Sequence, residues 1–183
     1  MKTEIDGDRI TLRRYEKRFA PLLFEAARES AGGEFTRWMP WCHENYSIED
    51  SRSFVKRSVE EWQNETEFNF AVFDAANGDF LGGVGLSQYN KNHKFFNLGY
   101  WIRTSRQNRG FASAATRLLA RASFEDLPIN RIEILAVIEN AASHRVAEKA
   151  GATREGVLRK RLLIGGTIHN AVMFSLVRED FNL

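Results

Sequence analysis

The hydrophobic pattern of the chain changes its period at Gly110, and this change restricts the folds that the sequence can adopt. Between residues 68 and 103, apolar and polar residues alternate over several short stretches, as in β-strands. After Gly110 the apolar residues recur at helical spacing up to residue 122, and residues 132–138 form a further apolar strand. A helix that joins two strands of one sheet makes them parallel neighbours. We therefore expect antiparallel strands first, and then one parallel pair across this helix.

Short strands and helices alternate along the rest of the chain. The expected elements are a strand at 10–12, helices at 19–27 and 54–62, strands at 68–73, 80–86 and 95–103, a helix from 111, a strand at 132–138, a helix at 140–150 and two strands that flank Gly165-Gly166. Ser47 and Asp50 resemble a capping box ahead of the second helix. The order β-α-α-β-β-β-α-β-α-β-β predicts an α/β (α+β) fold with a mixed central sheet of about seven strands and four helices.

Length and composition favour one domain. The 183 residues are 43% hydrophobic, which suffices for one full core, and no linker or repeat divides them. We therefore predict a single domain over residues 1–183, with its core at about residues 8–179. With 26 Lys plus Arg against 24 Asp plus Glu, the net charge of +2 gives little support for a specific nucleic-acid partner. Oligomeric state stays open, since a monomer and a homodimer both fit.

Other features bear on metal, disulfides and location. The single Cys42 excludes an internal disulfide, and no Cys or His stands near it at zinc-ligand spacing, so we expect no metal. The first residues are charged and lack the apolar core of a signal peptide. No apolar run approaches membrane-spanning length. We therefore expect a cytoplasmic protein without a membrane partner.

A polar, basic turn precedes the helix that begins after Gly110. Residues 103–112 read Arg-Thr-Ser-Arg-Gln-Asn-Arg-Gly-Phe-Ala. The free N–H groups in the first turn of a helix carry partial positive charge, and small residues let an anion approach them. The turn therefore predicts an anion site, although an ordinary solvated helix start can have the same composition. Gly83-Val84-Gly85 lacks the third glycine of a dinucleotide fingerprint, and no Walker lysine motif occurs.

Motifs around this turn resemble a known family. Gln107-x-x-Gly110-x-Ala112 matches the pyrophosphate-binding signature of the GNAT N-acetyltransferase superfamily. Gly99-Tyr100-Trp101-Ile102, Glu139-Asn140-Ala141-Ala142-Ser143 and Trp38-Met39-Pro40-Trp41 match as well. Together they resemble the branch of ribosomal-protein N-terminal acetyltransferases that contains RimJ and RimL. The resemblance implies the GNAT fold, acetyl-CoA as cofactor, and direct attack of an amine on the acetyl group in a ternary complex.

The resemblance also implies a cofactor site, residue by residue. Main-chain amides from Gln107 to Ala112 would bind the pyrophosphate, and the strand around Trp101 would pair with the pantetheine arm and offer an amide to the oxyanion. The implied cofactor-binding residues are Trp101, Ile102, Arg103, Gln107, Asn108, Arg109, Gly110, Phe111, Ala112, Ser113, Asn140 and Ser143. Ser143 is also the implied catalytic residue, which protonates or hydrogen-bonds the leaving thiolate. Asn140 would bind the pantetheine arm, cap the next helix, or do both.

The acceptor is less defined by the sequence. The resemblance implies a substrate-binding groove formed by Trp38, Trp41 and His43 and by the Gly165-Gly166 hairpin. These aromatic side chains would clamp a peptide or a cationic amine. The RimJ/RimL likeness favours the α-amine at a protein N-terminus, and a polyamine or an antibiotic amine is the alternative.

The general base is open as well. The candidates are Glu65, Glu67, His43, Glu44 and water. Asn97 stands on a strand where members of this branch often carry Glu, and Ala152 replaces a common Phe. A module that binds acyl-CoA without catalysis is therefore the second hypothesis.

Overall fold

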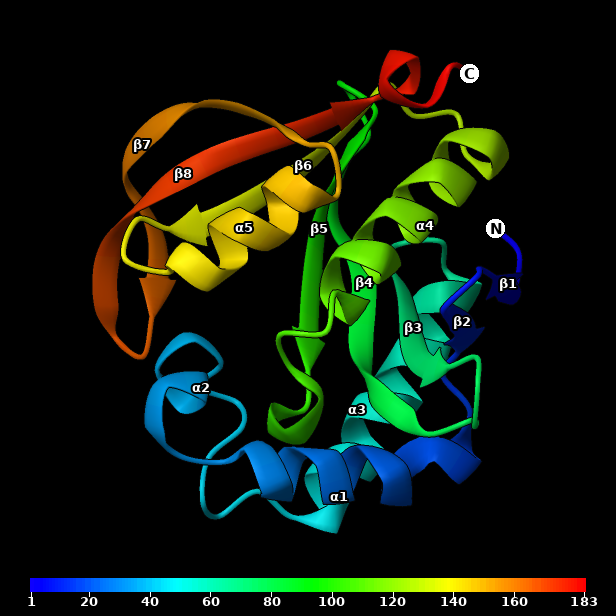
Figure 1. Ribbon diagram of the computed structural model, residues 1–183, viewed down its shortest axis with the longest axis vertical. Coiled ribbons are helices and arrows are strands. Elements are labelled where there is room, and N and C mark those ends of the chain that lie inside the picture. Colours follow the sequence, from blue (N-terminus) through cyan, green and yellow to red (C-terminus); the bar gives the residue numbers. More distant parts are fainter.

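The computed structural model describes residues 1–183 and contains one eight-stranded sheet with the strand order β1-β2-β3-β4-β5-β6-β8-β7 (Figure 1). The strands are β1 (Glu4–Asp6), β2 (Ile10–Arg14), β3 (Phe68–Asp74), β4 (Phe80–Asn90), β5 (Phe95–Ile102), β6 (Arg131–Val137), β7 (Thr153–Ile164) and β8 (Thr167–Val177). The helices are α1 (Ala20–Ser30), α2 (Gly33–Trp38), α3 (Ile48–Gln63), α4 (Phe111–Asp126) and α5 (Ala141–Lys149). The predicted mixed sheet, flanked by helices, is confirmed.

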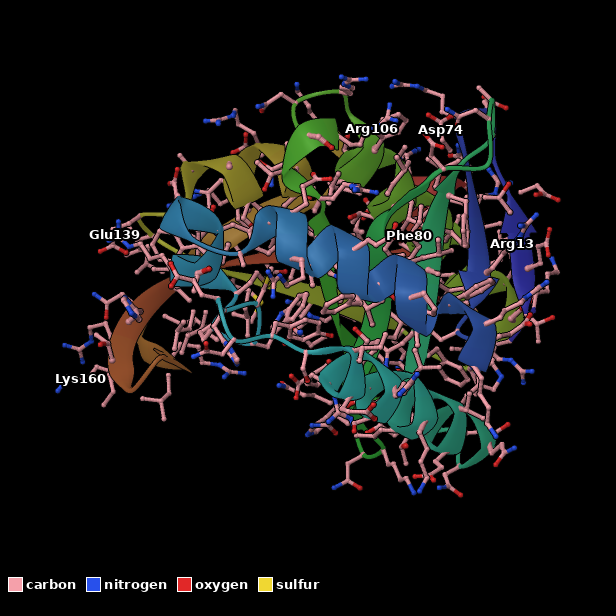
Figure 2. All side chains as sticks on the ribbon, turned by 90° about the horizontal axis from the view of Figure 1, so that it is seen from below. Arg13, Asp74, Phe80, Arg106, Glu139 and Lys160 are labelled. Atoms are coloured by element: carbon pink, nitrogen blue, oxygen red, sulfur yellow. The ribbon has the colours of Figure 1, made fainter.

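Helices cover both faces of the sheet. The apolar stripe of α4, which includes Phe111, Ala115 and Leu119, is buried against β2, β4 and β5. On the other face, α1 packs on β4 and α3 packs on β3, and Figure 2 looks onto these two helices. The helical spacing after Gly110 therefore arises because only one side of α4 meets the sheet.

The parallel pair lies where the change of period predicts it. β5 and β6 are parallel, but they pair only at Phe95–Asn97 and Arg131–Glu133. Beyond these residues the two strands diverge, and α5 lies over β6 while α4 lies over β5 (Figure 1). Every other neighbouring pair in the sheet is antiparallel. The divergence leaves the edge of β5 from Leu98 to Ile102 without a partner on the β6 side.

Two short elements add to the predicted order. β1 has three residues, and only Ile5 among them is buried, so it gives almost no periodic signal. α2 lies in the segment that we expected to be a loop; it begins after Gly32 and contains no buried residue. The predicted capping box of α3 is present, because Asp50 N donates to Ser47 Oγ at 3.3 Å and Ser47 N donates to Asp50 Oδ2 at 2.8 Å. None of the helices combines the length and the apolar character that a membrane span requires.

Candidate active site

The turn between β5 and α4 presents a row of main-chain N–H groups. Asn108 and Gly110 adopt left-handed conformations with φ of +60° and +81°. The amides of residues 108 to 113 donate to no acceptor within the protein. The Gln107 side chain fixes the start of the turn, since its Nε2 donates to the Ile102 carbonyl at 3.0 Å. Unpaired amides at the positive end of a 16-residue helix form an anion-binding site.

Helix α1 holds this turn from the other face of the sheet. Glu29 accepts hydrogen bonds of 2.8 Å from Ser105 N and from Arg103 Nε, and Ser30 Oγ accepts one of 3.1 Å from Thr104 N. Although partial burial raises the pKa of Glu29, the bonds from Arg103 and Ser105 outweigh it and lower that pKa to about 2. Glu29 is therefore ionised at neutral pH and fixes the turn to α1.

A cavity of about 590 Å³ opens from this turn into the gap between β5 and α5. It is bounded by α2, the end of β5, the start of α4 and one face of α5. Ten of the predicted cofactor residues line it, namely Trp101, Ile102, Gln107, Asn108, Gly110, Phe111, Ala112, Ser113, Asn140 and Ser143. The cavity thus connects the unpaired amides with the free edge of β5.

The structure does not bring the other two predicted cofactor residues, Arg103 and Arg109, to this cavity. The Arg103 guanidinium is paired with Glu29 on α1. The Arg109 side chain is exposed, and its carbonyl accepts a hydrogen bond of 2.8 Å from Arg9 Nη2. A sequence pattern shows that these arginines are near the turn, but not which way their side chains point.

Other cations line the cavity in their place. Arg106, labelled in Figure 2, lies at the turn and pairs with Asp79 at 2.5 Å. Arg145 and Lys149 lie one helical turn apart on α5, and both line the cavity. The cavity therefore has a positive rim as well as main-chain donors.

Tyr100 and Ser143 both line this cavity and contact each other. The Tyr100 hydroxyl lies 2.9 Å from Ser143 Oγ and also donates to the Ser143 carbonyl at 2.9 Å. Asn140 caps α5, because its Oδ1 accepts from Ser143 N at 3.0 Å. Burial raises the pKa of Tyr100 to about 12, although the hydrogen bond from Ser143 opposes the rise. The hydroxyl of Tyr100 is therefore protonated at neutral pH.

Tyr100 is the residue that the motif analysis did not single out, although it belongs to the matched stretch Gly99-Tyr100-Trp101-Ile102. The alternation of side chains along β5 could have identified Tyr100. It lies on the same face of the strand as Leu98 and Ile102, and its hydroxyl is the only polar side-chain group on that face. His144, in contrast, is directed to β6, where its Nε2 lies 3.0 Å from the Val137 carbonyl. Ser143 is thus paired with a tyrosine of the sheet and not with its neighbouring histidine.

A second cavity, of about 580 Å³, lies on the opposite face of β4 and β5, under α1 and α3. Its floor contains Gly83, Gly85 and Gly99, which have no side chains to fill the space. Its walls are aromatic, formed by Tyr15, Trp41, Tyr46, Phe54 and Trp101. Met39, Tyr100 and Trp101 line both cavities, so the two cavities adjoin at this point of β5.

The predicted substrate-binding residues divide between the two cavities. Trp41 and His43 line the second cavity, whereas Trp38 lines the first. The Trp38 ring contacts His169 of β8 at a centroid distance of 6.4 Å, and this contact joins α2 to the β7–β8 hairpin. The tip of the hairpin, Gly165-Gly166, lines neither cavity.

Among the four side chains considered as bases, only His43 lines a cavity. Glu44 and Glu65 are exposed. Glu67 accepts a hydrogen bond of 3.2 Å from Asn69 Nδ2, and Asn69 does line the second cavity. Asn97 is half-buried, and its buried Oδ1 lacks a hydrogen-bond partner, but the residue lines neither cavity. Its direct strand partner Ser87 lines the second cavity, so the replacement of Glu by Asn lies next to that cavity.

An anion-binding helix start, an unpaired strand edge and a second cavity at the same strand define an acyl-CoA-dependent acyltransferase. The chain belongs to the GNAT acetyltransferase family, since residues 9–153 match the family described as "Acetyltransferase (GNAT) domain". It is an N-acetyltransferase that uses acetyl-CoA, as the family does. The resemblance of its motifs to this family is thereby confirmed.

Known proteins similar to this chain agree with the family. It is 28% identical to the probable N-acetyltransferase YjcK of Bacillus subtilis (strain 168), over 74% of this chain and 75% of that protein. It is 26% identical to the ribosomal-protein-serine acetyltransferase of Escherichia coli (strain K12), over 73% and 74% of the two chains. Its fold is similar to the crystal structure of RimL, a ribosomal L7/L12 alpha-N-protein acetyltransferase in complex with coenzyme A. The TM-score is 0.86 at 20% identity, over 97% of this chain and 99% of that chain.

Proposed function

We propose that this protein transfers the acetyl group of acetyl-CoA to the N-terminal α-amine of a protein or peptide. The observation that carries the proposal is that the two cavities adjoin at Tyr100 and Trp101. Acetyl-CoA enters from the side of α4 and α5, and the amine enters from the side of α1 and α3. The amine nitrogen attacks the thioester carbonyl carbon, the C–S bond breaks, and CoA leaves as the thiolate, which takes a proton from solvent. The proton that the amine nitrogen loses passes to His43 or water. Both substrates are held together, which makes the attack effectively intramolecular.

The cofactor is bound chiefly by main-chain groups. The amides of residues 108 to 113 hold the pyrophosphate, and the helix dipole of α4 supports them. The pantetheine arm pairs with the free edge of β5, between Leu98 and Ile102, and one amide of this edge stabilises the oxyanion. The Asn140 side chain uses its Oδ1 to cap α5, which leaves its Nδ2 to donate to the arm.

Tyr100 and Ser143 together stabilise the leaving sulfur. An ordinary thiol has a pKa of about 8.5, well below the value of about 12 for Tyr100. Tyr100 therefore keeps its single proton. When the sulfur is bound, this proton turns from the Ser143 carbonyl to the sulfur, directly or through the Ser143 hydroxyl. Stabilisation of a departing thiolate by fixed donors lowers the barrier without a full proton transfer.

The composition of the second cavity favours an α-amine over a more basic amine. His43, Asp50 and Arg57 are its charged or titratable side chains other than tyrosines. Hydrogen bonds from the Ser47 side chain and backbone hold the pKa of Asp50 below its usual range, so Asp50 is a poor base. An N-terminal α-amine has a pKa of about 7.7 to 8.0, whereas a lysine-like amine has one near 10.4. The α-amine reaches its reactive free-base form with help from His43 or water alone.

The test is a comparison of acceptors. The purified protein is mixed with acetyl-CoA and with N-terminal peptides, including the N-termini of ribosomal proteins, or with polyamines, and free thiol is followed over time. Higher kcat/KM for peptides with a free N-terminus, and loss of the reaction when that terminus is blocked, supports the proposal. Turnover of polyamines alone rejects it.

A small-molecule amine is the second candidate. The aromatic walls of the second cavity favour it, because Trp41 lies near both Trp101 and Tyr46, with ring centroids 5.3 Å and 5.7 Å apart. Such rings can hold a cationic amine by cation–π attraction. The acceptor comparison separates the two candidates, since the first predicts turnover of peptides with a free N-terminus and the second predicts turnover of polyamines alone.

A further inference from the structure

We propose that Tyr15 and Trp101 form a subsite above Gly83 that binds the carbonyl oxygen next to the reacting amine. The acceptor is accordingly an α-amino amide, the group found at every peptide N-terminus. This inference rests on the proposed acetyl transfer and specifies which amines the second cavity accepts.

The first observation is an unsatisfied hydroxyl. Tyr15 is 1% exposed, lines the second cavity, and its Oη has no hydrogen-bond partner in the protein. Its ring packs edge-to-face on Phe54 at 5.1 Å, which holds the hydroxyl in place. A buried polar group without a partner destabilises a fold, so such groups are rare. Phenylalanine would fill the same space without this penalty, and a ligand that bonds to Tyr15 accounts for the hydroxyl.

The second observation is that another donor borders the same space. A Cβ atom at Gly83 would lie 2.9 Å from Tyr15 Oη and 2.7 Å from Trp101 Nε1. Gly83 and Trp101 are direct partners in the β4–β5 ladder, so the indole reaches across the strand next to it. Because Gly83 has no side chain, both groups can lie close to its Cα, which places two polar side-chain atoms side by side where Gly83 lines the second cavity.

The chemistry of the two groups selects the ligand atom. An indole N–H only donates, and a phenol can donate as well. Two donors that border one space suit an oxygen with two lone pairs, and an amide carbonyl has such an oxygen. A protonated amine has no lone pair to offer, so the second ammonium group of a polyamine does not suit this subsite. Trp101 also lines the cofactor cavity, which brings the subsite next to the place of acetyl transfer.

The test compares two small acceptors, glycinamide and propylamine; propylamine has a similar size but lacks the carbonyl. Tyr15→Phe removes only the hydroxyl, and Trp101→Phe removes the N–H but keeps a ring. Tyr89→Phe is the matched control, because Tyr89 stacks on Phe96 and lines neither cavity. For each variant, kcat/KM is measured with both amines at saturating acetyl-CoA, and the ratio to wild type removes the effect of their different pKa values.

We expect Tyr15→Phe and Trp101→Phe to lower kcat/KM for glycinamide about tenfold each, the effect of one lost hydrogen bond. With Tyr15→Phe the value for propylamine changes by less than about twofold, and with Trp101→Phe it falls less than the value for glycinamide, because Trp101 also lines the first cavity. Tyr89→Phe changes neither value. The melting temperature of Tyr15→Phe equals or exceeds that of wild type, because the variant loses an unsatisfied group. Equal ratios for the two amines overturn the proposal, and so does a lower melting temperature.

Failure of the proposed function gives a different result. If wild type acetylates neither amine, the transfer proposal fails, and the subsite is then tested by calorimetric titration of glycinamide into the CoA complex. Weaker glycinamide binding by Tyr15→Phe than by wild type supports the subsite in that case. Equal binding by the two proteins, or no binding by wild type, overturns it.

Discussion

The Tyr100 hydroxyl lies 2.9 Å from Ser143 Oγ, although the two residues are 43 positions apart in the chain. Tyr100 comes from β5 and Ser143 from the first turn of α5, and the crossover through α4 and β6 brings them together. Both residues line the first cavity, and Tyr100 also lines the second cavity. A leaving sulfur placed where the two cavities adjoin would therefore lie next to both hydroxyls, although each hydroxyl is weakly reactive.

Removal of either hydroxyl should slow the chemical step and leave cofactor binding nearly intact. We expect Tyr100→Phe and Ser143→Ala each to lower kcat by about 10- to 100-fold, because a fixed donor to the leaving group acts mainly in the transition state. The double variant should lose little more than the worse single variant, since the residues act as a unit. Steady-state kinetics and calorimetry of CoA binding measure both effects. Wild-type kcat in the Ser143 variant across the pH range would contradict this role.

A bulky charge at the turn should abolish cofactor binding. Gly110→Asp introduces a side chain where φ is +81° and adds a negative charge beside the amides that hold the pyrophosphate. Gly78→Asp is the matched control, because Gly78 has a φ of +76° and no heavy atom within 4 Å of its Cβ position. Calorimetric titration with CoA should show no heat for Gly110→Asp and normal heat for the control. Equal binding by both variants would show that the anion site lies elsewhere.

Glu29 should stabilise the turn in a pH-dependent way. Its pKa is about 2 in the folded protein, against an ordinary value of 4.5. A lowered folded-state pKa gives stability that is full above pH 4.5 and is lost as the pH falls from 4.5 towards 2. Glu29→Gln should therefore lower the free energy of unfolding by about 1 kcal/mol at pH 7, and less at acidic pH.

The control for Glu29 is Glu25→Gln, an exposed carboxylate on the same helix. Chemical denaturation between pH 3 and 7 compares the two variants with wild type. We also expect the affinity for CoA to fall several-fold in Glu29→Gln and to stay unchanged in Glu25→Gln. Glu29 holds the turn whose unpaired amides we propose to bind the pyrophosphate. A pH-independent difference between Glu29→Gln and wild type would argue against this ion pair.

Arg145 and Lys149 should recognise the extra phosphate on the ribose of CoA. Both line the cofactor cavity on one face of α5, and no residue of the protein forms a salt bridge with either. We expect Arg145→Ala to weaken binding of CoA about fivefold, as one charge-assisted contact at a partly exposed site is lost. Binding of dephospho-CoA should not change. Arg121→Ala, an exposed arginine of α4 that pairs with Glu125 at 3.0 Å, is the control. Equal weakening of both ligands would place these cations at the pyrophosphate instead.

Much of the fold could be predicted from the sequence because local patterns record burial. The strand alternation of residues 68–103 and the helical stripe after Gly110 arise from one buried face in each element, and the parallel pair follows from their order. β1 and α2 were not predicted, because a strand with one buried residue and a helix with none leave no periodic trace. The left-handed Gly110 and the unpaired amides of the turn were predictable for a similar reason, since glycine and a helix start are local features.

The sequence by itself determined the order of the elements, the anion-binding turn at Gly110 and the family to which these motifs belong. Only the tertiary structure decided which side chains face the cavities. It directs Arg103 to Glu29, pairs Tyr100 with Ser143, and brings Tyr15 and Trp101 to the space above Gly83. The physical reason is that backbone conformation depends on neighbours in the chain, whereas a side chain finds its partners among residues that only the folded sheet brings close.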